Sequence, residues 1–428
     1  MLSSNRSTWR AALAFALLTT ARMASAATPE EMEARLNALA SQVAALQSEV
    51  AQLKAQKVAA AAPAPAAPVT SAPAVATEAA SQVQWFGYGE LNYSRPTSDA
   101  SAATADVGRF VLGASYAFDD KTRFVSEVEV EHAIASAEDA GEVEIEQAYI
   151  ERKLTDGVFA KAGLFLIPVG MLNENHEPTR YYGVFRNFVE TAIIPTTWRE
   201  GGFAVQGNTA GGLRWDAGIS TGFNLSNWDA TAGEGQETPL GSIHQELSLA
   251  AAGDLSIFGA LNYGGVPGLR LGASVFTGEA DQGQPGFDNN RVTLWEGHAR
   301  WNPGNWDLSA LYARGTISNT ADINTTLVGN PTLIPEAFFG WYAEAAYRAT
   351  LPNDWALAPF ARYELFNTGS SYASIGAGLT PDPLEDEKVL TAGFNLDIAR
   401  GVVLKVDYLH FDLDDNNDRV DLGLGYQF

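Results

Sequence analysis

Hydrophobic and polar residues alternate along the last ten residues of the chain. One set of alternate positions holds Val420, Leu422, Leu424, Tyr426 and Phe428, and the other holds Arg419, Asp421, Gly423, Gly425 and Gln427. Successive side chains of a β-strand point to opposite faces, so this segment presents one apolar and one polar face. The pattern predicts a strand that separates an apolar environment from water.

The same period of two recurs from Val83 onward and predicts about sixteen strands. Short turn-like connections, such as Thr155-Asp156-Gly157 and Ala399-Arg400-Gly401, alternate with long ones, such as Pro168 to Gly201 and Leu225 to Asp254. An even number of strands with short turns at one end and long loops at the other is typical of an outer-membrane barrel. Residues 83–428 are therefore predicted to form an all-β fold, a 16-stranded antiparallel transmembrane β-barrel.

The first 26 residues have the pattern of a secretory signal peptide. Arg6 and Arg10 precede an apolar stretch from Ala11 to Leu18, and Ala24-Ser25-Ala26 supplies the small residues of a cleavage site. We expect export of the chain, with the mature protein beginning at Ala27.

Residues 27–57 carry a heptad pattern, with Leu36, Val43 and Val50 at a and Met32, Leu39, Leu46 and Leu53 at d. The pattern predicts a short periplasmic coiled coil. It leaves open a dimer or a trimer, and also an amphipathic helix that lies on the barrel or on peptidoglycan. Residues 58–82 are rich in Ala and Pro and are expected to form a linker.

Composition excludes several kinds of chemistry. The chain has no cysteine, which excludes disulfides, thiolate metal sites and cysteine nucleophiles. Its 27 Lys and Arg residues and 51 Asp and Glu residues give a formal charge of −24, which argues against nucleic-acid binding. In a pore, the same excess of carboxylates would favour cations.

Alternate residues of a strand face the same side, and this strand parity predicts many charged side chains on the inner face of the barrel. The expected inward set comprises Arg109, Arg123, Glu127, Glu129, Glu131, Glu142, Glu144, Glu146, Arg214, Arg270, Arg300, Arg348, Arg362, Glu364, Lys405, Asp407 and Arg419. Its six glutamates between Glu127 and Glu146 lie on one hairpin, where facing like charges require compensation. Two interpretations stay open: a cation-attracting vestibule or divalent-ion site, and a charged wall matched by arginines of adjacent strands.

The long connection Pro168 to Gly201 is the candidate constriction. Its charged residues are Glu174, His176, Glu177, Arg180, Arg186, Arg199 and Glu200. A long loop rich in aromatic residues is usually functional, and folded into the barrel it would narrow the channel between Arg and Glu side chains. A surface lid or a subunit contact is the alternative.

The chain resembles the Gram-negative porins, and within them the phosphate-selective porins O and P. The similar segments are Gln147-Ala148-Tyr149-Ile150, Ala162 to Gly170, Pro359 to Glu364 and Val403 to Tyr408. The resemblance implies a homotrimeric 16-stranded barrel in the outer membrane, whose terminal Tyr426 and Phe428 are recognised by the barrel-assembly machinery. The lysine clusters of that family are absent, because only Lys121, Lys153, Lys161, Lys388 and Lys405 follow Val83. The fold therefore carries over to this chain, and the substrate does not.

These observations favour a porin that passes ions and small hydrophilic solutes, with mild cation preference. The alternatives are an anion-selective or phosphate-selective pore that uses Arg180, Arg186 and Arg199, and a structural barrel that tethers the envelope. We expect no cofactor, no metal and no catalytic residues. Gly218-Ile219-Ser220-Thr221-Gly222 matches a nucleophile elbow but lies within a predicted strand, and the five histidines are scattered.

Overall fold

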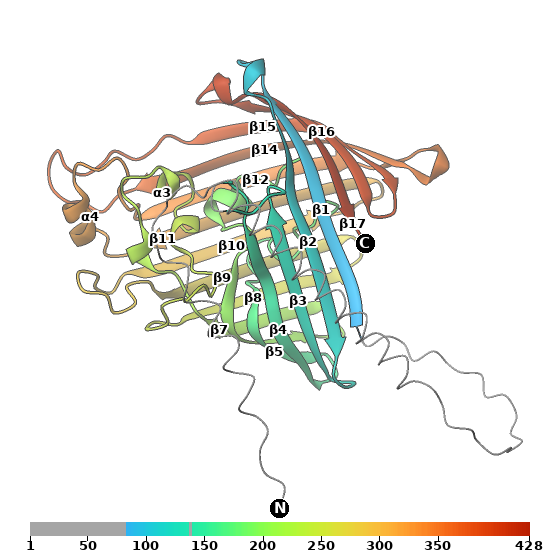
Figure 1. Ribbon diagram of the computed structural model, residues 1–428, viewed down its shortest axis with the longest axis horizontal. Coiled ribbons are helices and arrows are strands. Elements are labelled where there is room, and N and C mark those ends of the chain that lie inside the picture. The colour runs from blue at the N-terminus through green and yellow to red at the C-terminus, as the bar shows by residue number, and fades with distance from the viewer. Residues whose placement is uncertain (1–82, 137–138) are drawn as a thin grey trace, which may run out of the picture. The chain divides into compact units, whose positions relative to one another are not determined.

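The predicted strands form one closed antiparallel sheet, which confirms the barrel (Figure 1). The computed structural model describes residues 83–136 and 139–428, so the predicted signal peptide, coiled coil and linker lie outside the described residues. Neighbours in sequence pair along the whole sheet, and β1 (Val83–Pro96) pairs with β17 (Arg419–Gln427) to close it. Closure leaves no unpaired sheet edge, as a strand-built membrane protein requires.

The other strands follow in chain order. They are β2 (Thr104–Ala117), β3 (Thr122–Glu131), β4 (Val143–Thr155), β5 (Val158–Leu166), β6 (Arg199–Asn208), β7 (Leu213–Ser220), β8 (Ser256–Val266), β9 (Leu269–Glu279), β10 (Arg291–Trp301), β11 (Trp306–Ile317), β12 (Ala337–Tyr347), β13 (Ala349–Thr350), β14 (Ala356–Ser371), β15 (Glu387–Ala399) and β16 (Val402–Phe411). The two-residue β13 continues β12 past Arg348, and both pair with β14. The seventeen segments therefore form sixteen strands of the barrel, as the sequence predicts.

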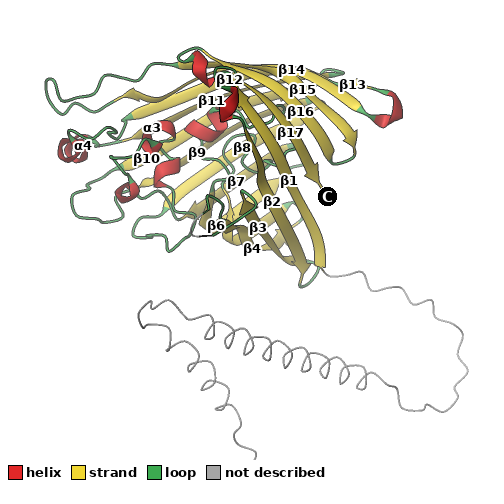
Figure 2. Cartoon of the chain, turned by 45° about the horizontal axis from the view of Figure 1, so that its top comes forward, coloured by secondary structure: helices red, strands yellow, loops and turns green. Residues whose placement is uncertain are grey.

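Short and long connections alternate around the barrel, which is also as predicted. The long connections carry the helices α3 (Glu234–Glu237) and α4 (Ala321–Leu327), and Figure 2 shows both at the same end of the barrel. Among the described residues, no helix is both long and apolar enough to cross a membrane.

The outer face of the barrel is apolar, as the alternation predicts. On β17, Val420 and Leu422 are exposed whereas Asp421 is fully buried on the inner side. Exposed rings gather near the short turns of β10 to β14, where Trp301, Trp306, Tyr347 and Trp355 lie. Aromatic residues at this level suit the boundary between a bilayer and water.

A hydrophobic cluster occupies the interior of the barrel toward the long connections. Inward residues of the strands, including Phe276 and Phe338, pack against Trp198 and Phe223 of the long connections. The Trp198 ring lies 5.1 Å from Phe223 and 4.5 Å from Phe276, between centroids. This cluster fixes the long connections that follow β5 and β7 against the wall of the barrel.

Gly163 of β5 offers a test of this wall. Its φ of +133° is rarely adopted by other residues, and a Cβ there would lie 2.3 Å from the carbonyl oxygen of Ala148. We expect Gly163→Ala to lower the free energy of unfolding by about 1–3 kcal/mol or more, because of backbone strain and the clash. Urea unfolding of the detergent-solubilised protein measures this loss.

Gly259→Ala on β8 is the matched control. The nearest atom to its added Cβ is the Asp216 carbonyl oxygen at 3.6 Å, which is ordinary contact. Equal stability losses in the two variants would contradict the account of Gly163.

Candidate functional site: the loop inside the barrel

The connection between β5 and β6, residues 167–198, lies inside the barrel. The Tyr181 hydroxyl donates to Glu90 of β1 at 2.9 Å, and the Val184 amide donates to Asp407 of β16 at 2.6 Å. The Phe188 amide donates to Glu364 of β14 at 2.7 Å. β1, β14 and β16 are not neighbours of β5 or β6 in the sheet, and β14 lies about half the barrel away from β5, so the loop crosses the interior.

The Glu190 carboxylate holds the loop in its folded shape. It accepts hydrogen bonds from the backbone amides of Met171 and Leu172, both at 2.7 Å, and from the Tyr342 hydroxyl of β12 at 2.8 Å. Burial raises the pKa of the Glu190 carboxyl, and these donors act in the opposite direction. One buried side chain thus joins both ends of the loop to the barrel wall.

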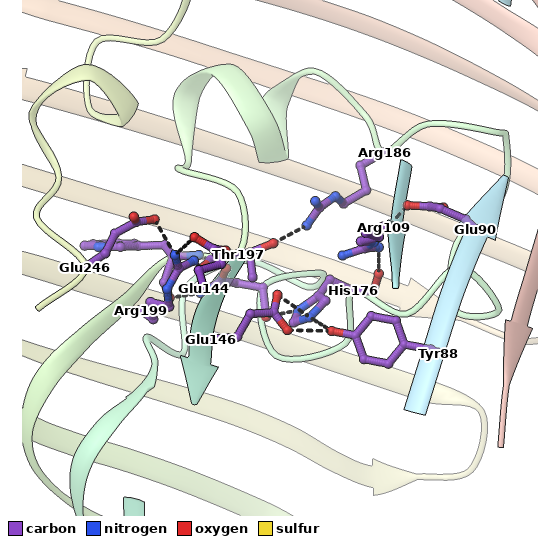
Figure 3. Close-up of polar contacts among 12 residues, drawn as sticks. Tyr88, Glu90, Arg109, Glu144, Glu146, His176, Arg186, Thr197, Arg199 and Glu246 are labelled. Atoms are coloured by element: carbon purple, nitrogen blue, oxygen red, sulfur yellow. Dashed lines mark hydrogen bonds and ion pairs between the residues drawn. The ribbon is translucent and has the colours of Figure 1, made fainter. Parts of the chain in front are cut away.

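The acidic hairpin, formed by β3 and β4, faces the loop, and Figure 3 shows Glu146 of β4 beside His176. Glu127, Glu129 and Glu146 are buried, although strand parity points them into the interior. Glu144 is partly buried, Glu131 is the last residue of β3, and Glu142 comes just before β4, in the connection between the two strands. The loop therefore separates most of this acidic wall from open space in the barrel.

His176 is the loop residue that meets this wall. Its Nε2 atom lies 3.6 Å from Glu146 and 2.6 Å from the hydroxyl of Tyr88 on β1. Burial lowers the pKa of the His176 imidazole to about 4; Glu146 opposes this shift, and Arg109 and Arg186 add to it. The ring is therefore neutral at pH 7.

Sets of potential metal ligands occur at two places among the described residues. At the wall, Glu127, Glu146 and His176 each offer one atom within 4.8 Å of the others, and Glu129, Glu144 and Glu146 form an overlapping set. The other place is the end of β16 and its connection to β17, with His410 on the strand and Asp415 and Asp418 in the connection.

The predicted constriction is wrong in its end point, because Arg199 and Glu200 do not belong to the loop. Both lie on β6, which begins at Arg199, so the loop is shorter than the predicted Pro168 to Gly201. Arg199 is 3% exposed and is paired with Glu144 and Glu246, and Glu200 is fully buried and accepts from Thr221 at 2.5 Å. Neither side chain reaches open space, because the hydrophobic cluster and the acidic wall enclose this end of β6.

Open space remains between the loop and β7 to β10. A cavity of about 350 Å³ is lined there by loop residues, among them Glu174 and Arg180, and by Arg214, Arg270, His298 and Arg300 of the strands. Arg214 pairs with Glu174 at 2.8 Å, and the Arg300 Nε donates to Asp307 at 2.8 Å. Arg270 is exposed and forms no ion pair within the part of the chain that the structure describes.

Most of the remaining predicted residues form ion pairs or hydrogen bonds that hold the loop or the barrel strands in place. Near the loop lie Arg109, paired with Glu90 at 2.8 Å; Glu177, bonded to Gln427 at 3.1 Å; Arg186, bonded to Thr197 at 3.1 Å; Arg362, paired with Glu344 and Glu364; Lys405, 3.6 Å from the centre of the Tyr181 ring; and Arg419, paired with Asp421. Away from it lie Arg123, paired with Glu151; Arg348, paired with Asp397; and the chain end, where Phe428 is exposed and Tyr426 is partly buried.

Sequence reasoning missed several residues that position the loop. Glu90, Asp307 and Glu344 lie on inner faces and accept hydrogen bonds from loop or wall side chains. The same period of two that found the other inward charges would have found these three. Tyr88 and Tyr342 carry no comparable signal, because a tyrosine suits either face of a barrel strand.

Comparison with known proteins shows the fold. No protein-family model matches the chain. An uncharacterized protein of Aquifex aeolicus (strain VF5) is 28% identical over 341 residues, which cover 78% of this chain and 76% of that protein. The resemblance to phosphate-selective porins O and P thus stays a prediction.

Three solved structures are similar to 81% of the chain. They are Salmonella typhi OmpF in complex with daunomycin (TM-score 0.58, 16% identity, 97% of that chain covered), the outer-membrane channel DcaP of Acinetobacter baumannii (0.50, 14%, 97%) and an anion-selective porin from Comamonas acidovorans (0.50, 12%, 99%). At these identities the similarity shows that the chain has the barrel fold of outer-membrane porins and channels.

Glu190→Ala tests how the loop is held. The variant removes the carboxylate oxygen that both backbone amides share, so the amides of Met171 and Leu172 lose their acceptor at a cost of about 1–3 kcal/mol. We expect faster hydrogen exchange at these two amides, by roughly tenfold or more, while the strand amides stay protected. Glu234→Ala, in the helix α3 of another loop, is the control; unchanged exchange in the Glu190 variant would contradict the assigned role.

Proposed function

We propose that the protein is an outer-membrane porin, a water-filled channel for passive diffusion of ions and small hydrophilic solutes. The closed barrel, the apolar outer face and the charged inner face support this function. The loop across the interior would narrow the channel and leave the arginine-lined cavity as its open part. We further propose that residues 1–26 are removed on export, that residues 27–57 lie in the periplasm, and that the barrel assembles as a homotrimer.

The position of the charges favours anions in this constriction. Four arginines, Arg180, Arg214, Arg270 and Arg300, line the cavity, and Glu174 is the carboxylate among its lining residues. The formal charge of −24 favours cations, but three glutamates of the acidic hairpin are buried behind the loop. Charges at the narrowest part of a pore act on the ion at short range and set its selectivity.

This version of anion selectivity differs from the one that the sequence suggests. Of Arg180, Arg186 and Arg199, only Arg180 is among the residues that line the cavity. Arg186 bonds Thr197, and Arg199 is buried in ion pairs. The arginines of β7, β9 and β10 take their place in the proposal.

Planar-bilayer recording of the purified protein under a KCl gradient tests the proposal. We expect stepwise conductance and a reversal potential of anion-selective sign. The absence of conductance would contradict the porin, and a cation-selective sign would show that the overall negative charge outweighs the arginines.

Arg270→Ala gives the sharper test of the arginine cluster. Arg270 has no carboxylate partner among the described residues, so its removal leaves no unpaired glutamate or aspartate behind. We expect the reversal potential to move toward the cation side and the conductance to persist.

Arg314→Ala is the control, because it removes the same charge from β11 at a position that alternates with the buried, inward Ala313. Equal shifts in the two variants would show that the effect is not local to the cavity.

A further inference from the structure

We propose that Glu127, Glu146 and His176 form a binding site for one divalent transition-metal ion, with Zn²⁺ as the representative case. Glu127 comes from β3, Glu146 from β4 and His176 from the loop, and Figure 3 shows Glu146 and His176 side by side. One ligand atom of each lies within 4.8 Å of the other two. The site is independent of what the barrel conducts.

Hydrogen bonding orients the imidazole as a metal ligand. The His176 Nδ1 atom lies 2.8 Å from the backbone carbonyl oxygen of Asn173, which can only accept. Nδ1 must therefore carry a proton, and Nε2 is the ring nitrogen that faces Glu146 and the Tyr88 hydroxyl. A metal-bound histidine typically donates its other ring N–H to a carbonyl or carboxylate in this way.

The carboxylates around His176 are incompletely hydrogen-bonded. Glu146 is fully buried, Glu127 is 8% exposed and Glu129 is 2% exposed, yet one oxygen of each has no hydrogen-bond partner among the described residues. The Tyr88 hydroxyl, within reach of both Glu146 and His176, has a single proton and can donate to only one of them. Buried carboxylate oxygens without donors are costly, so either a bound cation or protons shared between the carboxyl groups must compensate them.

Arg109 lies close enough to attract Glu129 and Glu146, but it makes no hydrogen bond to them, and one of its terminal nitrogens has no hydrogen-bond partner among the described residues. Its Nε donates to Glu90 at 2.8 Å, and one terminal nitrogen donates to the backbone carbonyl oxygen of His176. None of its hydrogen bonds reaches the three buried glutamates. A cation held between Nε2 and the carboxylates would satisfy all of these acceptors together.

The ligand set indicates the kind of ion. Ca²⁺ and Mg²⁺ prefer oxygen ligands alone, whereas Zn²⁺ and its neighbours bind imidazole and carboxylate together. Zn–N and Zn–O bonds of about 2.0–2.2 Å place adjacent ligand atoms of a tetrahedral site roughly 3.4 Å apart. The Nε2–Oε1 distance between His176 and Glu146 is 3.6 Å, which fits this spacing, and the Tyr88 hydroxyl 2.6 Å from Nε2 would have to become a ligand or move aside.

A bound ion would join the loop to the wall. It would connect His176 to two adjacent strands on the side of the barrel away from the cavity at β7 to β10. The overlapping set at Glu129, Glu144 and Glu146 shares Glu146, so the arrangement suits one ion and not two.

Zinc titration of the full-length, detergent-solubilised protein tests the site. After treatment with a chelator and its removal, calorimetry with ZnCl₂ is expected to show one ion bound per chain. His176→Gln and Glu127→Gln are each expected to weaken binding by roughly 10- to 100-fold or more. X-ray absorption of the wild-type zinc complex is expected to show scattering from one imidazole.

His298→Gln is the matched control. This histidine also lies in the barrel interior beside a buried glutamate, with Nδ1 2.8 Å from Glu296, but belongs to none of the ligand sets of the described residues. It should retain one zinc ion. Folding of each variant is verified by its heat-modifiable migration, and Glu127→Gln decides the matter where His176→Gln does not fold.

Absence of zinc binding to the wild-type protein would overturn the proposal and leave shared protons to compensate the glutamates. Undiminished binding in a folded Glu127 or His176 variant, or an all-oxygen absorption spectrum, would also overturn it. Undiminished binding in these variants would direct attention to His410, Asp415 and Asp418 instead.

Discussion

The pairing of the first strand with the last is the constraint on which the rest of the structure depends. Between Tyr88↔Gln427 and Pro96↔Arg419, β1 and β17 complete a sheet whose backbone groups would otherwise be unpaired at two edges. Closure also defines an inside and an outside, so that the period of two along each strand sorts apolar from polar side chains. The interior then has to accommodate the charges that the strands deliver to it, and the loop after β5 supplies many of their partners.

Strand parity explains why the fold was accessible from the sequence. Alternation is a local property, and in strands such as β15 and β17 it survives over nearly the whole length, so their number and order could be predicted. The ends of the strands are harder to predict from alternation. Arg199 and Glu200 were assigned to the loop because the residues around them do not alternate clearly, whereas their backbone pairs with Leu166 and Phe165.

The site was harder to predict, because the partners of its charged residues are distant in sequence. Tyr181 and Glu90 are 91 residues apart, and Val184 and Asp407 are 223 residues apart. The apolar residues of the loop, Val169, Val189 and Ile193, were visible in the sequence and indicate a buried segment. The net charge of the chain predicts ion selectivity poorly, because it gives a carboxylate buried behind the loop the same weight as one beside open space.

The path of the loop also constrains how the barrel is made. Residues 167–198 precede β14 to β16 in the chain, yet they bond Glu364, Asn395 and Asp407 on those strands. Such contacts join residues far apart in sequence and form late, after the entropy of closing long segments has been overcome. The loop must already lie on the inner side when the last strands come round to β1. Enclosure of the loop and completion of the wall therefore belong to a single late step of assembly.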